Sequence, residues 1–369
     1  MKAAVKLTNT YIGHPVERVE DERFLRGYGR FTDDLNRPEQ WHAAIVRSPI
    51  AHGRIIAIDT SPCREVGGIH AVITGEDLGD AIPVIPFRRP NPTIAPFAQP
   101  VIARERVRYA GEPVAMVLAN SPERAQDAAA ATALEIEPLP VVLSRDTALA
   151  GDVRLFAGTG NCASTFTAQK GDAASAFRAG GRITRGAFSV QRMTAAPMEP
   201  RALLAEWDDG AQRLTVSGAA KLPFFNRRAL AAMMRLAETQ VDYIEYDVGG
   251  GFGARGEFYP EDYLVAFAAR KFRHPVKWTE DRREHFLSIA HSRETECELE
   301  LALDESGAIA GLRGEIYADI GAYVRPNGMT PVRNAAQFLS GAYRIPNIDV
   351  RSHALLSNKV PSGTYRGPG

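Results

Sequence analysis

The segment best suited to hold a ligand is Asp247-Val248-Gly249-Gly250-Gly251-Phe252-Gly253. Its four glycines within five residues allow positive φ angles and let a ligand come close to the main chain. Successive backbone N–H groups in such a turn can hold a phosphate or an oxo group. The pattern therefore predicts an anion-binding turn. The alternative is a tight strand-to-helix turn that binds nothing.

Two other segments offer polar groups that could act together with this turn. Gln191, which begins the segment Gln191–Arg201, provides a neutral donor and a neutral acceptor in one side chain. Arg366, within Thr364-Tyr365-Arg366-Gly367, could clamp a planar anion. Each of these segments taken alone is equally compatible with a solvated surface loop.

The composition argues against several classes of protein. The 369 residues contain 44 basic and 44 acidic side chains, whereas a nucleic-acid-binding protein usually has a basic excess. The three cysteines form no CxxC pair, which argues against an iron–sulfur cluster or a thiolate zinc site within the chain. Neither a signal-peptide core nor an apolar run of about 18 residues is evident. We therefore expect a cytoplasmic chain with no membrane span.

Apolar alternation and turn residues predict an α+β protein with two regions. Short strands and a helix that starts after Ser121 make residues 41–143 one α+β region. A loop at 80–100, which contains six prolines, interrupts it. Residues 144–182 are expected to form a connector with a short helix at 173–177. A second α+β region starts near residue 183.

The second region is expected to position the glycine-rich segment between a strand and a helix. The strand is predicted over 241–248, and the helix over 261–271. The remaining elements expected in this region are a helix at 226–238 and strands at 202–207, 213–217, 294–303 and 308–318.

Several segments, in this order, resemble the molybdopterin-binding large subunit of the molybdenum hydroxylases. This family contains xanthine dehydrogenase, aldehyde oxidase and carbon monoxide dehydrogenase. Besides the three segments described above, the resemblance is carried by Gly13–Asp21, Phe24–Phe31, Arg47–Gly53, Tyr109–Ala115 and Pro275–Arg282. It extends over nearly the whole chain and corresponds to the N-terminal half of the family's subunit.

The resemblance implies an N-terminal arm over 1–19, an α/β hammerhead domain over 20–143 and the first half of a molybdopterin cofactor-binding domain over 144–369. It implies no residue that ligates the metal directly. It assigns contacts with the cofactor to Gln191, Gly250, Gly251, Phe252, Gly253, Thr364, Tyr365 and Arg366.

The family's reaction, which the resemblance implies here, inserts a water-derived oxygen into a C–H bond of an aldehyde or an N-heterocycle. The glutamate that acts as general base lies in the C-terminal half of the family's subunit, so no residue of this chain takes that role. Glu257, Gly367 and Pro368 are expected to line the substrate pocket. Gly367 stands where carbon monoxide dehydrogenase has a copper-binding cysteine, and Pro368 where the purine-oxidising branch has phenylalanine. Both residues favour an aldehyde or another N-heterocycle.

The same resemblance implies a molybdopterin cofactor with molybdenum, in its cytosine dinucleotide form. It also implies a small subunit with two 2Fe-2S clusters and a medium subunit with FAD. A second molybdopterin subunit could supply the C-terminal half, and a partner's signal could export the complex.

Two alternatives remain open at this stage. One is a truncated, non-catalytic homologue that acts as a scaffold for partner subunits and binds no cofactor. The other is a nicotinamide-dependent dehydrogenase. For that enzyme, a GxGxxG motif starting at Gly249 would need a glycine at position 254, where the chain has Ala254.

Overall fold

The computed structural model describes residues 11–88, 91–179 and 181–367. Helices and strands alternate along the chain, and they confirm the expected α+β class. The helices are α1 Asp21–Leu25, α2 Ser61–Glu65, α3 Pro122–Ala131, α4 Arg145–Ala150, α5 Ala173–Arg178, α6 Pro223–Met234, α7 Pro260–Phe272, α8 Arg282–Ser288 and α9 Met329–Gln337, with 3₁₀ turns η1 Thr32–Asp34, η2 Gly75–Leu78, η3 Ala95–Phe97, η4 Glu238–Gln240 and η5 Ala254–Gly256. The strands are β1 Trp41–Arg47, β2 Gly53–Asp59, β3 Ile69–Thr74, β4 Arg106–Val107, β5 Pro113–Ala119, β6 Ala133–Pro138, β7 Cys162–Lys170, β8 Arg182–Val190, β9 Met193–Thr194, β10 Ala202–Asp208, β11 Arg213–Gly218, β12 Val241–Ile244, β13 Val276–Thr279, β14 His291–Ser292, β15 Thr295–Leu303, β16 Ile309–Gly321 and β17 Asn347–Leu356.

A seven-stranded sheet joins the two regions that the sequence separates. Its strand order is β12-β11-β10-β13-β1-β5-β3, so three strands from the first region continue a sheet of four from the second. The join is the parallel pair β1 and β13, in which Trp41 lies opposite Val276. The first region therefore adds its strands to the sheet that leads to the glycine-rich segment. A separate three-stranded sheet, β4-β2-β6, completes the first region.

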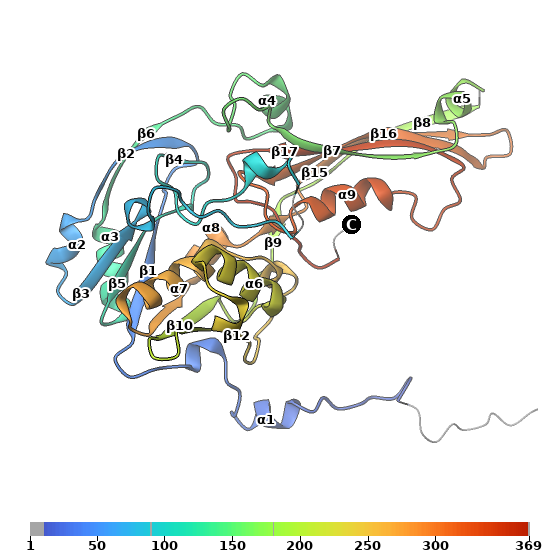
Figure 1. Cartoon of the computed structure of the whole chain (residues 1–369). Helices are drawn as coiled ribbons and strands as arrows, with labels where there is room; N and C mark the ends of the chain where they lie inside the picture. The colour runs from blue at the N-terminus through green and yellow to red at the C-terminus, as the bar shows by residue number, and fades with distance from the viewer. Residues whose placement is uncertain (1–10, 89–90, 180, 368–369) are drawn as a thin grey trace, which may run out of the picture.

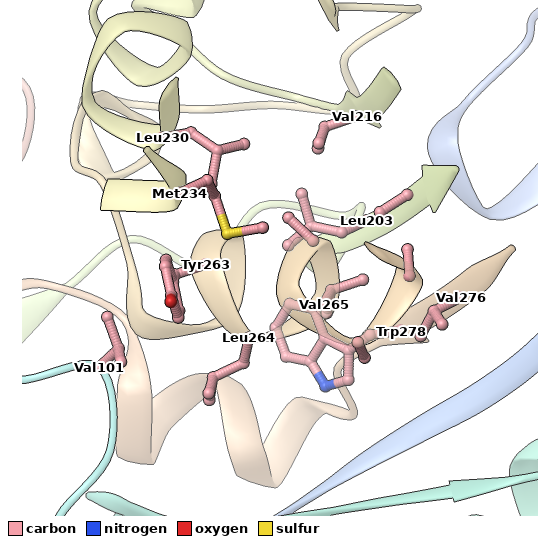
Figure 2. Close-up of a cluster of buried hydrophobic side chains, with 14 of the residues drawn as sticks. Val101, Leu203, Val216, Leu230, Met234, Tyr263, Leu264, Val265, Val276 and Trp278 are labelled. Atoms are coloured by element: carbon pink, nitrogen blue, oxygen red, sulfur yellow. The ribbon is translucent and has the colours of Figure 1, made fainter. Parts of the chain in front are cut away.

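The largest buried apolar cluster lies where α6 and α7 cover this sheet (Figures 1 and 2). Leu264 and Val265 of α7 are completely buried, and so is Leu230 of α6. Trp278 of β13 is 1% exposed and fills the centre of the cluster. Because burying each such side chain stabilises a fold by about 1.5–3 kcal/mol, this cluster fixes α7, the helix that follows the glycine-rich segment.

A five-stranded sheet extends to one side of the molecule (Figure 1). Its strand order is β7-β17-β16-β15-β8, and α5 and α9 pack against it. Strands β8 and β15 are antiparallel over their full nine residues, from Arg182 opposite Leu303 to Val190 opposite Thr295. The link from β8 into β9 leads the chain from this sheet toward the glycine-rich segment. No helix in the described residues is long and apolar enough to cross a membrane.

Two expectations about local structure were wrong. Part of the supposed connector over 144–182 is the nine-residue strand β7, whose small and polar residues pair with β17. The strand expected over 241–248 ends at Ile244. Beyond it, the main-chain N–H of Asp247 donates to Arg30 O at 3.0 Å. The Asp247 carboxylate binds the Arg23 guanidinium at 2.5 and 2.6 Å, so residues 23–30, in and after α1, replace the sheet as the partner of this segment.

A buried ion network holds the two regions together beside the glycine-rich segment. Arg201 binds Glu280 at 2.8 Å and Glu261 at 3.0 Å. Glu261 also binds Arg47, from the end of β1, at 2.6 Å. The charges of both arginines hold the pKa of the buried Glu261 at about 2, against the opposing effect of burial. Because all these groups are buried, removing one would leave an unpaired charge in the interior.

We predict that Arg201→Met lowers the free energy of unfolding by about 3–5 kcal/mol, because it removes the guanidinium that pairs with both Glu261 and Glu280 in the interior and leaves Glu261 with Arg47 alone. Arg213→Met is the matched control, because Arg213 forms an exposed ion pair with Asp242. Its cost should stay below about 1 kcal/mol. Urea denaturation of both variants measures the difference, and equal costs would contradict the structural role given to the network.

A buried carboxyl group forms a second link between the regions. Glu112 accepts hydrogen bonds from the Tyr323 hydroxyl and from Arg108 N, each at 2.6 Å. Burial raises the pKa of Glu112 to about 7, against about 4.3 for an unfolded glutamate. The folded state therefore binds this proton more tightly. The resulting stabilisation is complete below about pH 4.3 and is lost as the pH rises to about 7.

We predict that Glu112→Gln removes this part of the pH dependence. Between about pH 4.5 and 7, the wild-type free energy of unfolding should fall more steeply than that of the variant. The comparison needs urea denaturation at a series of pH values. Parallel curves for the two proteins would show that Glu112 does not titrate with the raised pKa.

Candidate functional site

The glycine-rich segment forms an open turn between β12 and η5. Gly250, Phe252 and Gly253 have φ angles of 109°, 47° and 93°. Positive φ is readily available to glycine and is uncommon for phenylalanine, so the surroundings must hold Phe252 in place. The Phe252 residue is 47% exposed. The turn thus presents its backbone at the surface, as the glycine pattern predicts.

The segment 197–200 supports the turn from one side. The N–H of Gly249 donates to the Glu199 carboxylate at 2.8 Å, and the N–H of Glu199 donates to Gly249 O at 3.2 Å. Arg255, which is 4% exposed, binds the carbonyl oxygens of Glu199 and Pro200 at 2.6 and 3.1 Å. Its guanidinium also pairs with the Glu199 carboxylate at 3.0 Å. Burial lowers the pKa of Arg255, and the charge of Glu199 opposes that shift.

The segment 364–366 supports the turn from another side. The N–H of Arg366 donates to Phe252 O at 2.7 Å, and the Thr364 hydroxyl donates to Gly253 O at 3.3 Å. A Cβ on Gly253 would lie 3.0 Å from Thr364 O, so only glycine permits this approach. Arg293 holds the same segment by donating to Tyr365 O and Gly367 O at 3.0 and 2.8 Å.

These contacts leave the turn with a consistent polarity. The carbonyl oxygens of Gly249, Gly251, Phe252 and Gly253 accept hydrogen bonds from the protein. Within the part of the chain that the structure describes, the N–H groups of Gly250, Gly251, Phe252 and Gly253 donate to no protein acceptor. Such a row of free donors forms a cradle for an anionic or oxo ligand. We call these four N–H groups the amide cradle.

Glu257 lies behind the cradle and is 1% exposed. One carboxylate oxygen accepts from Asn327 N at 3.1 Å, and the other has no partner among the described residues. That free oxygen faces Gly363, where a Cβ would come within 2.7 Å of it. Burial raises the pKa of Glu257, whereas the charge of Arg325 lowers it. Glu257 is therefore packed beneath the Gly363–Thr364 backbone.

The structure brings together most, but not all, of the residues predicted for the site. Thr364, Tyr365 and Arg366 join the glycine turn. Gln191 is exposed in the link between β8 and β9, while residues 197–200 and 364–366 supply the contacts of the turn. Gly367 is exposed, and Pro368 lies outside the described residues.

Sequence analysis missed the residues that hold the turn from behind. Arg255 lies close to the turn in sequence, but its partners Glu199 and Pro200 are more than 50 positions away. Glu199 could be read only as a possible helix cap. The roles of Glu199 and Arg255 depend on tertiary contacts. The one local signal was the charge of Arg255, two positions after the last glycine of the run.

The cradle fits a cofactor that presents anionic or oxo groups to the main chain. The three atoms nearest a Cβ built on Gly251 all belong to the Arg255 side chain and lie 3.8–3.9 Å away, so the protein is not tightly packed against this glycine. Over residues 11–88, 91–179 and 181–367, no group of three or more His, Cys, Asp or Glu side chains could hold a metal ion. The free N–H groups of the cradle are donors for the anionic or oxo groups of such a cofactor.

Comparison with known families identifies two matches that together cover most of the chain. The molybdopterin cofactor-binding domain matches residues 156–369. The a/b hammerhead domain of aldehyde oxidase and xanthine dehydrogenase matches residues 26–140. The amide cradle and residues 364–366 both lie within the first match.

Relatives and solved structures give the same result. The gamma subunit of the 6-hydroxypseudooxynicotine dehydrogenase complex of Paenarthrobacter nicotinovorans is 40% identical over 97% of this chain and 46% of its own. The crystal structure of quinoline 2-oxidoreductase from Pseudomonas putida 86 has a TM-score of 0.85 and 34% identity, covering 95% of this chain and 45% of that one. The large molybdopterin subunit of nicotinate dehydrogenase from Eubacterium barkeri is 26% identical over 97% of this chain and 82% of its own. The chain spans about half the length of the first two.

Proposed function

Because the chain belongs to the molybdopterin-binding subunits of the xanthine dehydrogenase and aldehyde oxidase family, we propose that its amide cradle holds the molybdenum cofactor of a hydroxylase. The observation that carries this proposal is the set of four free N–H groups at Gly250, Gly251, Phe252 and Gly253, held outward by the bonded carbonyls. Donors fixed in this way need no reorganisation when a negative group arrives.

The residues of this chain would hold and orient the cofactor. The cradle would bind its oxo or phosphate oxygens, while Thr364, Tyr365 and Arg366 would close one side. When bound, the cofactor supplies a metal centre that transfers water-derived oxygen to a C–H carbon and accepts two electrons. Glu199 and Arg255 act on the main chain of the turn and keep its donors aligned. We include Gln191 as a cofactor contact on the family resemblance alone.

We propose an N-heteroaromatic substrate. Three similar proteins carry the names of such compounds or their derivatives: 6-hydroxypseudooxynicotine, quinoline and nicotinate. Gly367 and Pro368 stand where the family's carbon monoxide-oxidising branch has cysteine and its purine-oxidising branch has phenylalanine, which favours another substrate. Glu257 would line this pocket only from beneath the backbone of Gly363 and Thr364.

We also propose that this chain works within a larger assembly. The 6-hydroxypseudooxynicotine dehydrogenase subunit and the quinoline 2-oxidoreductase chain are about twice as long, so the residues of their second halves would come from further chain or from a second molybdopterin subunit. Those residues would include the glutamate that acts as general base. A small 2Fe-2S subunit and an FAD subunit would receive the electrons, the cofactor would be the cytosine dinucleotide form, and the complex would be cytoplasmic.

We predict that Gly251→Val abolishes cofactor binding without disturbing the fold. The atoms nearest a Cβ on Gly251 lie at ordinary contact distance, 3.8–3.9 Å, so we expect the fold to tolerate the added side chain while its bulk beside the Gly251 N–H keeps the cofactor off the cradle. A steric loss above about 1.4 kcal/mol costs more than tenfold in affinity, so the variant complex should retain less than about a tenth of the wild-type molybdenum. Mass spectrometry of the purified complex measures the metal.

Gly160→Val is the matched control, because a Cβ on Gly160 meets nothing within 4 Å. It should keep wild-type molybdenum content. If Gly251→Val also kept its molybdenum with an unchanged melting temperature, the cradle would not be the cofactor site. A wild-type complex that assembles without molybdenum would instead favour the scaffold.

A further inference from the structure

Two cationic side chains each lie against Gly256, next to the cradle, and the site described so far uses neither of them. Arg88 donates from Nη2 to Gly256 O at 3.2 Å. The Lys221 side chain passes the same residue, and its Cδ would lie 3.3 Å from a Cβ built on Gly256. Arg88 and Lys221 are both exposed residues. We call Arg88 and Lys221 the cationic corner.

Neither cation of the corner forms an ion pair within the described residues. Within the described residues, no carboxylate lies within 4 Å of the Lys221 ammonium or the Arg88 guanidinium. Helix α6 starts two residues after Lys221 and has no acidic residue in its first turn. Burial raises the pKa of the nearby Glu257, and the charge of Arg88 is among the influences that lower it, although the two groups form no ion pair. An exposed pair of cations without an ion-pair partner is suited to an anionic ligand.

Gly256 connects the corner with the amide cradle. Its N–H donates to Gly253 O at 2.9 Å, so it lies one short turn of η5 from the last glycine of the cradle. The Thr364 hydroxyl would be 3.9 Å from a Cβ on Gly256. Asn327 fixes the Gly256 carbonyl by donating from Nδ2 at 2.7 Å. Arg88 donates to the same carbonyl from Nη2, and its other N–H groups remain available to a ligand. A ligand seated at the cradle could therefore reach the corner with a side group.

We propose that the cationic corner binds a carboxylate carried by the substrate, so that the enzyme selects acidic N-heteroaromatic compounds over neutral ones. This inference rests on the proposed function, because it takes the substrate to sit beside the cradle. Arg88 supplies planar donors and is oriented by Gly256 O, and its guanidinium lies 5.7 Å from the Phe225 ring. Lys221 supplies a mobile point charge. An aromatic carboxylate would offer two oxygens to these donors.

The test uses nicotinate and nicotinamide as probes, because they share a pyridine ring and differ in charge. Calorimetric titration of the assembled complex at low salt measures the affinity of each. We expect the wild type to bind nicotinate more tightly than nicotinamide. Lys221→Met should weaken nicotinate binding about tenfold and change nicotinamide binding by less than about twofold.

Two control variants separate charge from other effects. Lys221→Arg keeps the charge and should keep the preference for nicotinate. Lys170→Met removes a lysine on β7 in the other sheet, where Nζ donates to Ile345 O, and should change neither affinity. Lys221 is exposed, so none of these changes is expected to unfold the protein.

Equal affinities for the two probes in the wild type would overturn the proposal, as would an unchanged preference in Lys221→Met. Molybdenum content is measured in the same samples. A Lys221→Met complex that lost its molybdenum would assign the corner to a phosphate of the cofactor and overturn the substrate assignment. If the wild-type complex held no molybdenum, the proposed function would fail, while the calorimetric comparison would still decide whether the corner binds a carboxylate.

Discussion

The site depends on one constraint: the glycine turn must keep its carbonyl oxygens bonded to the protein and its N–H groups free. Gly249 O and Phe252 O accept from Glu199 N and Arg366 N, which come from distant parts of the chain. With these carbonyls fixed, the neighbouring N–H groups face outward. Phe252 holds a φ of 47°, which is uncommon outside glycine, because the contacts on both sides determine it. An isolated peptide of the same sequence would have no such polarity.

The rest of the fold can be understood as support for this turn. The seven-stranded sheet carries β10, which follows residues 197–200, and β12, which leads into the turn. The ion network of Arg47, Arg201, Glu261 and Glu280 closes the space between β1 and α7. Because the first region contributes both strands and charges to this arrangement, it belongs to the support of the site.

The sequence allowed the prediction of features with a local cause. The glycine run and the helix α7 follow from residue type and apolar period alone. The strand β7 was missed because its small and polar residues resemble a linker, and only pairing with β17 makes it a strand. The support by Glu199 and Arg255 and the corner of Arg88 and Lys221 join residues more than 50 positions apart. Residue types and spacing contain no signal for such contacts, whereas the family resemblance located residues 364–366.

The central claim is that the amide cradle holds a molybdenum cofactor, and the most direct test is the metal content of the wild-type assembly. This chain would be co-expressed with the proteins encoded beside it and purified by a tag on this chain alone. Elemental mass spectrometry would then measure molybdenum and iron, and the absorbance of the same sample would measure flavin. We expect about one molybdenum per copy of this chain, since each copy has a single cradle among its described residues. A folded, assembled complex without molybdenum would contradict it.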